Sequence, residues 1–123
     1  MAKILVVEDE RTLNEAYELV LKKEGHNVQV AFNGQEALEV FKEQKPDLIL
    51  LDLRMPQMDG VEFLKKLKPL KNKLDVKIVI FSNYDDQKEI DSAFANGATR
   101  YILKAWSSPK ELAKVVDETL SQK

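Results

Sequence analysis

The sequence predicts an α/β domain in which a parallel sheet of about five strands is covered on both faces by about five helices. Two continuous apolar runs, residues 4–7 and 48–51, are typical of strands that are buried on both faces. Between the predicted strands, apolar residues recur at the three- and four-residue spacing of amphipathic helices. Repeated strand–helix units of this kind predict right-handed crossovers and a doubly wound sheet.

The predicted elements follow one another without a linker or a repeat. Strands are predicted over residues 4–7, 28–32, 48–52, 76–81 and 101–103. Helices are predicted over residues 11–24, from Asn33 through Phe41, from Val61 to Pro69, over residues 87–96, and from Pro109 to Leu120. Asn33 and Ser108 are expected N-caps, because each has a glutamate three residues later. Gly25 and Pro69 are expected to end the first and third helices, and His26 is expected at the surface.

The composition limits the class of protein. The 123 residues suffice for one compact domain, which we expect to fill residues 1–123. A net charge of −2 gives no indication of a nucleic-acid-binding face. The chain has no cysteine, which excludes disulfides and thiol catalysis and fits a reducing compartment. No apolar run approaches the ~18 residues of a membrane span, so we expect a cytoplasmic protein that binds neither membrane nor nucleic acid.

Polar residues follow the predicted strands at the point where each strand ends. Glu8 and Asp9 follow the first strand, Asp52 ends the third, Ser82 follows the fourth and Lys104 follows the fifth. The carboxyl ends of parallel strands meet at one edge, where open α/β sheets bind their ligands. Carboxylates that are crowded together repel one another, and a Mg²⁺ ion with oxygen ligands would relieve that repulsion.

A carboxylate, a cation, a lysine and a hydroxyl together favour phosphoryl transfer, which depends on positioning and charge neutralisation. Asp52 would act as the nucleophile and become an aspartyl phosphate. Mg²⁺ and Lys104 would neutralise the transferring oxygens, and Ser82 would bind one oxygen of the product.

The same residues carry a resemblance to a known family. The matching residues are Glu8-Asp9, the run from Asp47 to Asp52, the segment from Met55 to Gly60, Ser82, Gly97-Ala98 and Lys104. In order and spacing they resemble the receiver domain of two-component response regulators, and chemotaxis-like single-domain receivers in particular. The resemblance implies a flavodoxin-like sheet with strand order 2-1-3-4-5. It also implies that Asp52 accepts a phosphoryl group from the phosphohistidine of a histidine kinase or phosphotransfer protein.

The resemblance further assigns roles to single residues. The metal, Mg²⁺ with Mn²⁺ as a substitute, would be bound by Asp9, Asp52 and the backbone carbonyl of Arg54, with Glu8 acting through a water. Ser82 and Tyr101 would form the switch. Arg54 and Tyr84 would flank the acyl phosphate, and their bulk would lengthen its lifetime.

The switch would change the face made by the helix over residues 87–96, the strand over residues 101–103 and the final helix. A downstream protein or an output domain is the expected partner of this face, and a homodimer through it stays open. No external substrate is expected, so the protein would not be an enzyme in the usual sense.

Three other functions fit these residues less well. An aspartate-nucleophile phosphatase typically has a second aspartate two residues after the nucleophile, whereas Asp52 is followed at that position by Arg54. A flavodoxin-type nucleotide site needs a Gly-, Ser- or Thr-rich loop after the first strand, whereas residues 8–10 are all acidic. A scaffolding pseudo-receiver is a third alternative, and the intact set of site residues argues against it.

One position departs from the family pattern. Receivers usually have proline after the lysine, with a cis peptide bond, and this chain has Lys104-Ala105. A cis bond before a residue other than proline costs roughly 2.5–4 kcal/mol, so we expect a trans peptide and a rearranged loop. Trp106, the next residue, could be a contact anchor or could pack on the final helix.

Overall fold

The chain forms an open sheet with helices on both faces. The computed structural model describes residues 2–71, 76–83, 86–104 and 108–121. The strands are β1 (Lys3–Val7), β2 (Asn27–Ala31), β3 (Leu48–Asp52), β4 (Lys77–Ser82) and β5 (Arg100–Leu103). The helices are α1 (Arg11–Lys23), α2 (Gly34–Gln44), α3 (Gly60–Lys71), α4 (Gln87–Ala95) and α5 (Pro109–Leu120). The five strands are parallel and lie in the order β2-β1-β3-β4-β5, which confirms the expected fold class and strand order.

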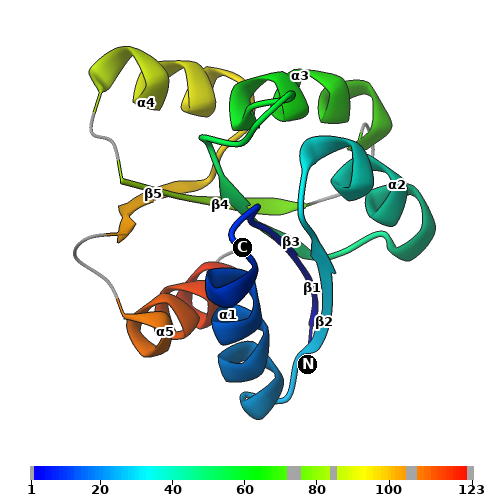
Figure 1. Cartoon of the computed structure of the whole chain (residues 1–123), viewed down its shortest axis with the longest axis vertical. Coiled ribbons are helices and arrows are strands. Elements are labelled where there is room, and N and C mark those ends of the chain that lie inside the picture. The colour runs from blue at the N-terminus through cyan, green and yellow to red at the C-terminus, as the bar shows by residue number, and fades with distance from the viewer. Residues whose placement is uncertain (1, 72–75, 84–85, 105–107, 122–123) are drawn as a thin grey trace.

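Two hydrophobic cores lie on opposite faces of the sheet. Helices α1 and α5 cover one face, and α2, α3 and α4 cover the other (Figure 1). Successive strand residues point to opposite faces, so β1 sends Ile4 and Val6 to the first core and Leu5 and Val7 to the second. β1 and β3 are buried on both faces, as their continuous apolar sequences predict.

The predicted helix starts are confirmed by their hydrogen bonds. The Asn33 side chain accepts a hydrogen bond from the Glu36 backbone N–H at 2.9 Å, and the Ser108 hydroxyl accepts one from the Glu111 N–H at 3.2 Å. Gly25 has a φ of 94°, a left-handed conformation that suits glycine and follows the end of α1. These signals are local, which is why the sequence alone could predict them.

Two expectations about the fold are wrong. α3 does not stop at Pro69 but continues to Lys71, so the proline lies in the last turn with only two helical residues after it. His26 is not exposed: its side chain is 10% accessible and contacts Asp117 of α5 at 2.8 Å. Its other ring nitrogen accepts a hydrogen bond from the Ala2 N–H, so the turn after α1 is tied to two distant segments.

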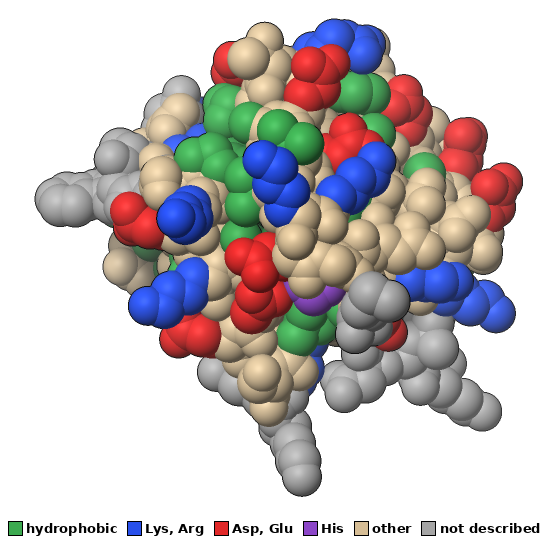
Figure 2. Space-filling view, turned by 90° about the horizontal axis from the view of Figure 1, so that it is seen from below, with side chains coloured by type: hydrophobic (Ala, Val, Ile, Leu, Met, Phe, Trp, Pro, Cys, Tyr) green, Lys and Arg blue, Asp and Glu red, His purple; other side chains and the backbone are tan. Residues whose placement is uncertain are grey.

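The described surface carries charges of both signs. On the face shown in Figure 2, acidic and basic side chains are interspersed rather than gathered in one region of a single sign. Among the described residues, no helix has both the length and the apolar character needed to cross a membrane.

Candidate functional site

The register of the strands brings distant residues together at the carboxyl edge of the sheet. Val7 of β1 is in register with Leu51 of β3, so the residues that follow them, Glu8 and Asp52, lie side by side. An open hollow of about 400 Å³ lies at this edge. The residues that line it come from four segments of the chain and are Glu8, Asp9, Glu10, Asp52, Arg54, Asn83 and Lys104.

Three carboxylates form a cluster in this hollow. Glu8 is 1% exposed and Asp52 is 4% exposed, whereas Asp9 reaches solvent. One oxygen from each of the three lies within 4.8 Å of the others. Burial, together with the neighbouring charge of Glu8, raises the pKa of Asp52 to about 7. Burial and Glu8 also raise the pKa of Asp9. Such an oxygen set fits a hard divalent cation, which would relieve the crowded charge.

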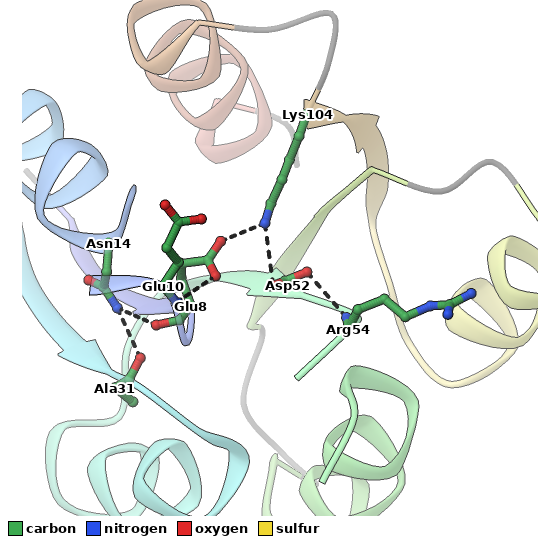
Figure 3. Close-up of polar contacts among 7 residues, drawn as sticks. All are labelled: Glu8, Glu10, Asn14, Ala31, Asp52, Arg54 and Lys104. Atoms are coloured by element: carbon green, nitrogen blue, oxygen red, sulfur yellow. Dashed lines mark hydrogen bonds and ion pairs between the residues drawn. The ribbon is translucent and has the colours of Figure 1, made fainter. Parts of the chain in front are cut away.

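Lys104 supplies a positive charge to this cluster (Figure 3). Its Nζ lies 2.6 Å from Glu8 Oε1 and 3.3 Å from Asp52 Oδ2, and it sits 4.9 Å from the centre of the Phe81 ring. Burial lowers the pKa of Lys104, but the hydrogen bond to Glu8 and the charges of Asp52 and Glu8 raise it overall. The ammonium therefore stays protonated between the two buried acids.

The backbone of Arg54 contacts the carboxylate cluster, whereas its side chain points away from it. The Arg54 N–H donates to Asp52 Oδ1 at 3.2 Å, so both oxygens of Asp52 have a partner. The guanidinium points away from Asp52 (Figure 3). It pairs instead with Glu89 in the first turn of α4, with Nε–Oε1 and Nη2–Oε2 distances of 3.0 Å each.

A known protein family matches this chain. The family described as the response regulator receiver domain matches residues 4–117 of the chain. The chain belongs to this family. Receiver domains are the phosphoacceptor signalling domains of two-component systems, and the acidic edge of the sheet is where they bind a metal ion.

Solved structures agree with the family assignment. A CheY-like receiver domain protein from Methanospirillum hungatei is 27% identical, with a TM-score of 0.89 over 98% of this chain and 94% of the other. The chemotaxis protein CheY4 from Vibrio cholerae is 28% identical, with a TM-score of 0.89 over 97% of this chain and 98% of the other. NtrX from Brucella abortus is 29% identical, with a TM-score of 0.85, and the match covers 97% of this chain but 26% of NtrX.

The remaining predicted residues of the receiver site are Ser82 and Tyr101 in β4 and β5, and residues outside the described part of the chain. Ser82, the last residue of β4, is fully buried and in register with Leu103, the residue before Lys104. Tyr101 of β5 is partly buried against the core under α2, α3 and α4. Tyr84 and the Lys104-Ala105 peptide with Trp106 involve residues outside those described.

Sequence reasoning missed Asn14, a buried residue of α1 beside the receiver site. Its Nδ2 donates to the carbonyl oxygens of Glu8 at 2.9 Å and Ala31 at 3.0 Å (Figure 3), and the Glu8 N–H donates to the same Ala31 carbonyl. Asn14 thereby holds the backbone at Glu8 against the end of β2. The sequence did carry a signal, because Asn14 is a polar residue next to Leu13 on the apolar side of the predicted helix. A buried amide in such a place needs hydrogen-bond partners.

Two further residues of the site were also missed. Asn83 lines the hollow directly after Ser82, and Glu89 binds the Arg54 guanidinium from α4. Neither stands out in the sequence, since polar residues are common in loops and in first turns of helices.

Proposed function

We propose that this receiver domain accepts a phosphoryl group on Asp52 from the phosphohistidine of a histidine kinase or phosphotransfer protein. The observation that carries the proposal is the placement of Asp52. It is a buried carboxylate at the edge of an open hollow, with an ammonium group on one oxygen and two more acids beside it. The receiver domain is proposed to occupy the whole chain, residues 1–123.

In the proposed step, a carboxylate oxygen of Asp52 forms a bond to phosphorus while the nitrogen–phosphorus bond of the phosphohistidine breaks. The leaving imidazole nitrogen keeps the electron pair. Lys104 would neutralise charge on the transferred oxygens, and the Ser82 hydroxyl would donate to one of them in the product. The Arg54 N–H on Oδ1 would keep the carboxylate oriented during the transfer.

Mg²⁺, with Mn²⁺ as a substitute, is the proposed cofactor. Asp9, Asp52 and the backbone carbonyl of Arg54 would hold it, with Glu8 acting through a water. The clustered oxygens and the raised pKa values of Asp9 and Asp52 support this assignment. When bound, the ion would supply charge neutralisation for the phosphoryl group.

The proposed output is a switch in which Ser82 and Tyr101 respond to the new phosphoryl charge. The face made by α4, β5 and α5 would then bind a downstream protein, an output domain or a second copy of the chain. Arg54 and Tyr84 would tune the lifetime of the acyl phosphate. We place this activity in the cytoplasm, which the lack of cysteine fits.

Turnover of an external substrate is not part of the proposal. A phosphatase with an aspartate nucleophile needs an acid or base two residues later, and Arg54 at that position is paired with Glu89. A pseudo-receiver that only scaffolds would have no need to keep Glu8, Asp52 and Lys104 in mutual contact.

Intact-mass measurement tests the proposed function. The protein is incubated with Mg²⁺ and acetyl phosphate, with Asp52→Asn and a sample treated with EDTA as controls. We expect the wild type alone, with Mg²⁺, to gain the mass of one phosphoryl group. Failure of the wild type to gain this mass, or an equal gain by Asp52→Asn, would contradict the proposal.

A further inference from the structure

The Arg54–Glu89 ion pair connects the edge of the phosphorylation site to α4. Both contacts between the guanidinium and the carboxylate measure 3.0 Å, which is the two-pronged geometry that arginine forms with carboxylates. Arg54 follows Asp52 by two residues, and its side chain is 49% exposed at the rim of the hollow. The pair therefore helps to hold the guanidinium on the α4 side of the rim.

Glu89 is well suited to hold this guanidinium. It lies in the first turn of α4, where the unpaired N–H groups of the helix stabilise a negative charge. Its side chain is 28% exposed, so the pair is partly shielded from solvent. Of the nine residues of α4, Ala93 is the one that is buried, and the Arg54–Glu89 pair links this mostly exposed helix to the β3–α3 loop.

A phosphoryl group on Asp52 would offer the guanidinium a second anion. It would bring a charge of about −1.5 to −2 and three acceptor oxygens to a carboxylate that already accepts a hydrogen bond from the Arg54 N–H. Guanidinium groups bind phosphate oxygens in the same two-pronged way as carboxylates. Glu89 and the phosphoryl group would thus compete for one side chain.

We propose that Glu89 is a positioning residue that holds the Arg54 guanidinium away from the acyl phosphate and thereby shortens its lifetime. Release of Arg54 from Glu89 lets the guanidinium lie over the phosphoryl group and obstruct the attacking water. This inference rests on the proposed function.

The test is a double-mutant cycle on the half-life of the phosphorylated protein, measured by intact mass after removal of acetyl phosphate. We expect Glu89→Gln to lengthen the half-life about three-fold, the size expected of a partly exposed ion pair. We expect the same substitution to have no effect when Arg54 is already alanine. Asp91→Asn is the matched control: it removes one negative charge from the same helix, but Asp91 pairs with Gln87 rather than with Arg54.

The outcomes separate this inference from the proposed function. If the wild type is not phosphorylated, the proposed function fails. If the wild type is phosphorylated but Glu89→Gln shortens the half-life or does not change it, the role of Glu89 is refuted and the proposed function stands. An effect of Glu89→Gln that persists in Arg54→Ala, or an equal effect of Asp91→Asn, also refutes it. Thermal melting of each variant shows whether it is folded.

Discussion

At the scale of single residues, the position of Asp52 at the carboxyl edge of the sheet has a cost to stability, because its carboxylate is buried. It is buried next to Glu8, and Lys104 offsets only part of the unfavourable burial. Its pKa rises from 3.8 to about 7 on folding. Between these two values the folded protein keeps a proton on Asp52 that the unfolded chain has released. The free energy of unfolding must therefore fall as the pH rises through this window.

This pH dependence gives a prediction for the metal-free protein. In EDTA, we expect the unfolding free energy of the wild type to fall by up to about 1.4 kcal/mol per pH unit between about pH 4 and pH 7. Asp52→Asn should lack this decrease. Urea titrations of wild type and Asp52→Asn across this range measure the difference. Asp91→Asn, which changes an exposed acid, should follow the wild-type curve. Parallel curves for wild type and Asp52→Asn would contradict the burial cost assigned to Asp52.

At the scale of elements, the loop from β3 to α3 is shaped by close backbone contacts. The Gly60 N–H donates to the Leu53 carbonyl at 2.8 Å, which closes the loop that carries Arg54. A Cβ on Gly60 would lie 2.7 Å from Leu53 Cα and 3.0 Å from the Asp52 carbonyl oxygen. A side chain at this position would push against the backbone of the proposed phosphorylation site itself.

Two glycines at helix starts allow a matched comparison. A Cβ on Gly34, the first residue of α2, would meet the Met58 side chain at 2.6 Å, and a flexible methionine can move away. We expect Gly60→Ala to cost about 1–3 kcal/mol of unfolding free energy and to slow phosphorylation by acetyl phosphate. Gly34→Ala should cost less than about 1 kcal/mol and leave the rate unchanged. Equal effects of the two substitutions on stability and rate would show that the Gly60 contacts do not shape the site.

The elements were largely predictable from the sequence because their signals are local. Strand alternation, helical spacing and the caps at Asn33 and Ser108 each depend on residues a few positions apart. Local signals were insufficient where tertiary contacts or an unusual backbone conformation decide the structure. His26 lies in a turn that the sequence indicates is solvated, yet tertiary contacts with Asp117 and Ala2 leave it only partly exposed. α2 ends at Lys45 in a left-handed conformation, with a φ of 48°, for which this lysine gives no sequence signal.

At the scale of the whole molecule, the site was predictable only as a set of strand ends. Parallel topology places Glu8, Asp52 and Lys104 at one edge, and the pattern of apolar runs was enough to expect this. Which side chains then pair could not be predicted. The Arg54–Glu89 pair and the contacts of Asn14 depend on how α4 and α1 pack on the sheet, and single-sequence patterns do not encode packing angles.

The unfavourable charge at the site should couple metal binding to the stability of the whole fold. The proposed Mg²⁺ ion would bind the folded carboxylate cluster and not the unfolded chain, so it would raise the unfolding free energy by about 2.7 kcal/mol at a concentration one hundred times its dissociation constant. We expect urea titrations at pH 8 to show this increase for the wild type relative to EDTA. Asp9→Asn should show little of it, and because Asp9 is exposed the substitution itself should cost little stability. Stabilisation of Asp9→Asn equal to that of the wild type would mean that Mg²⁺ acts elsewhere on the molecule.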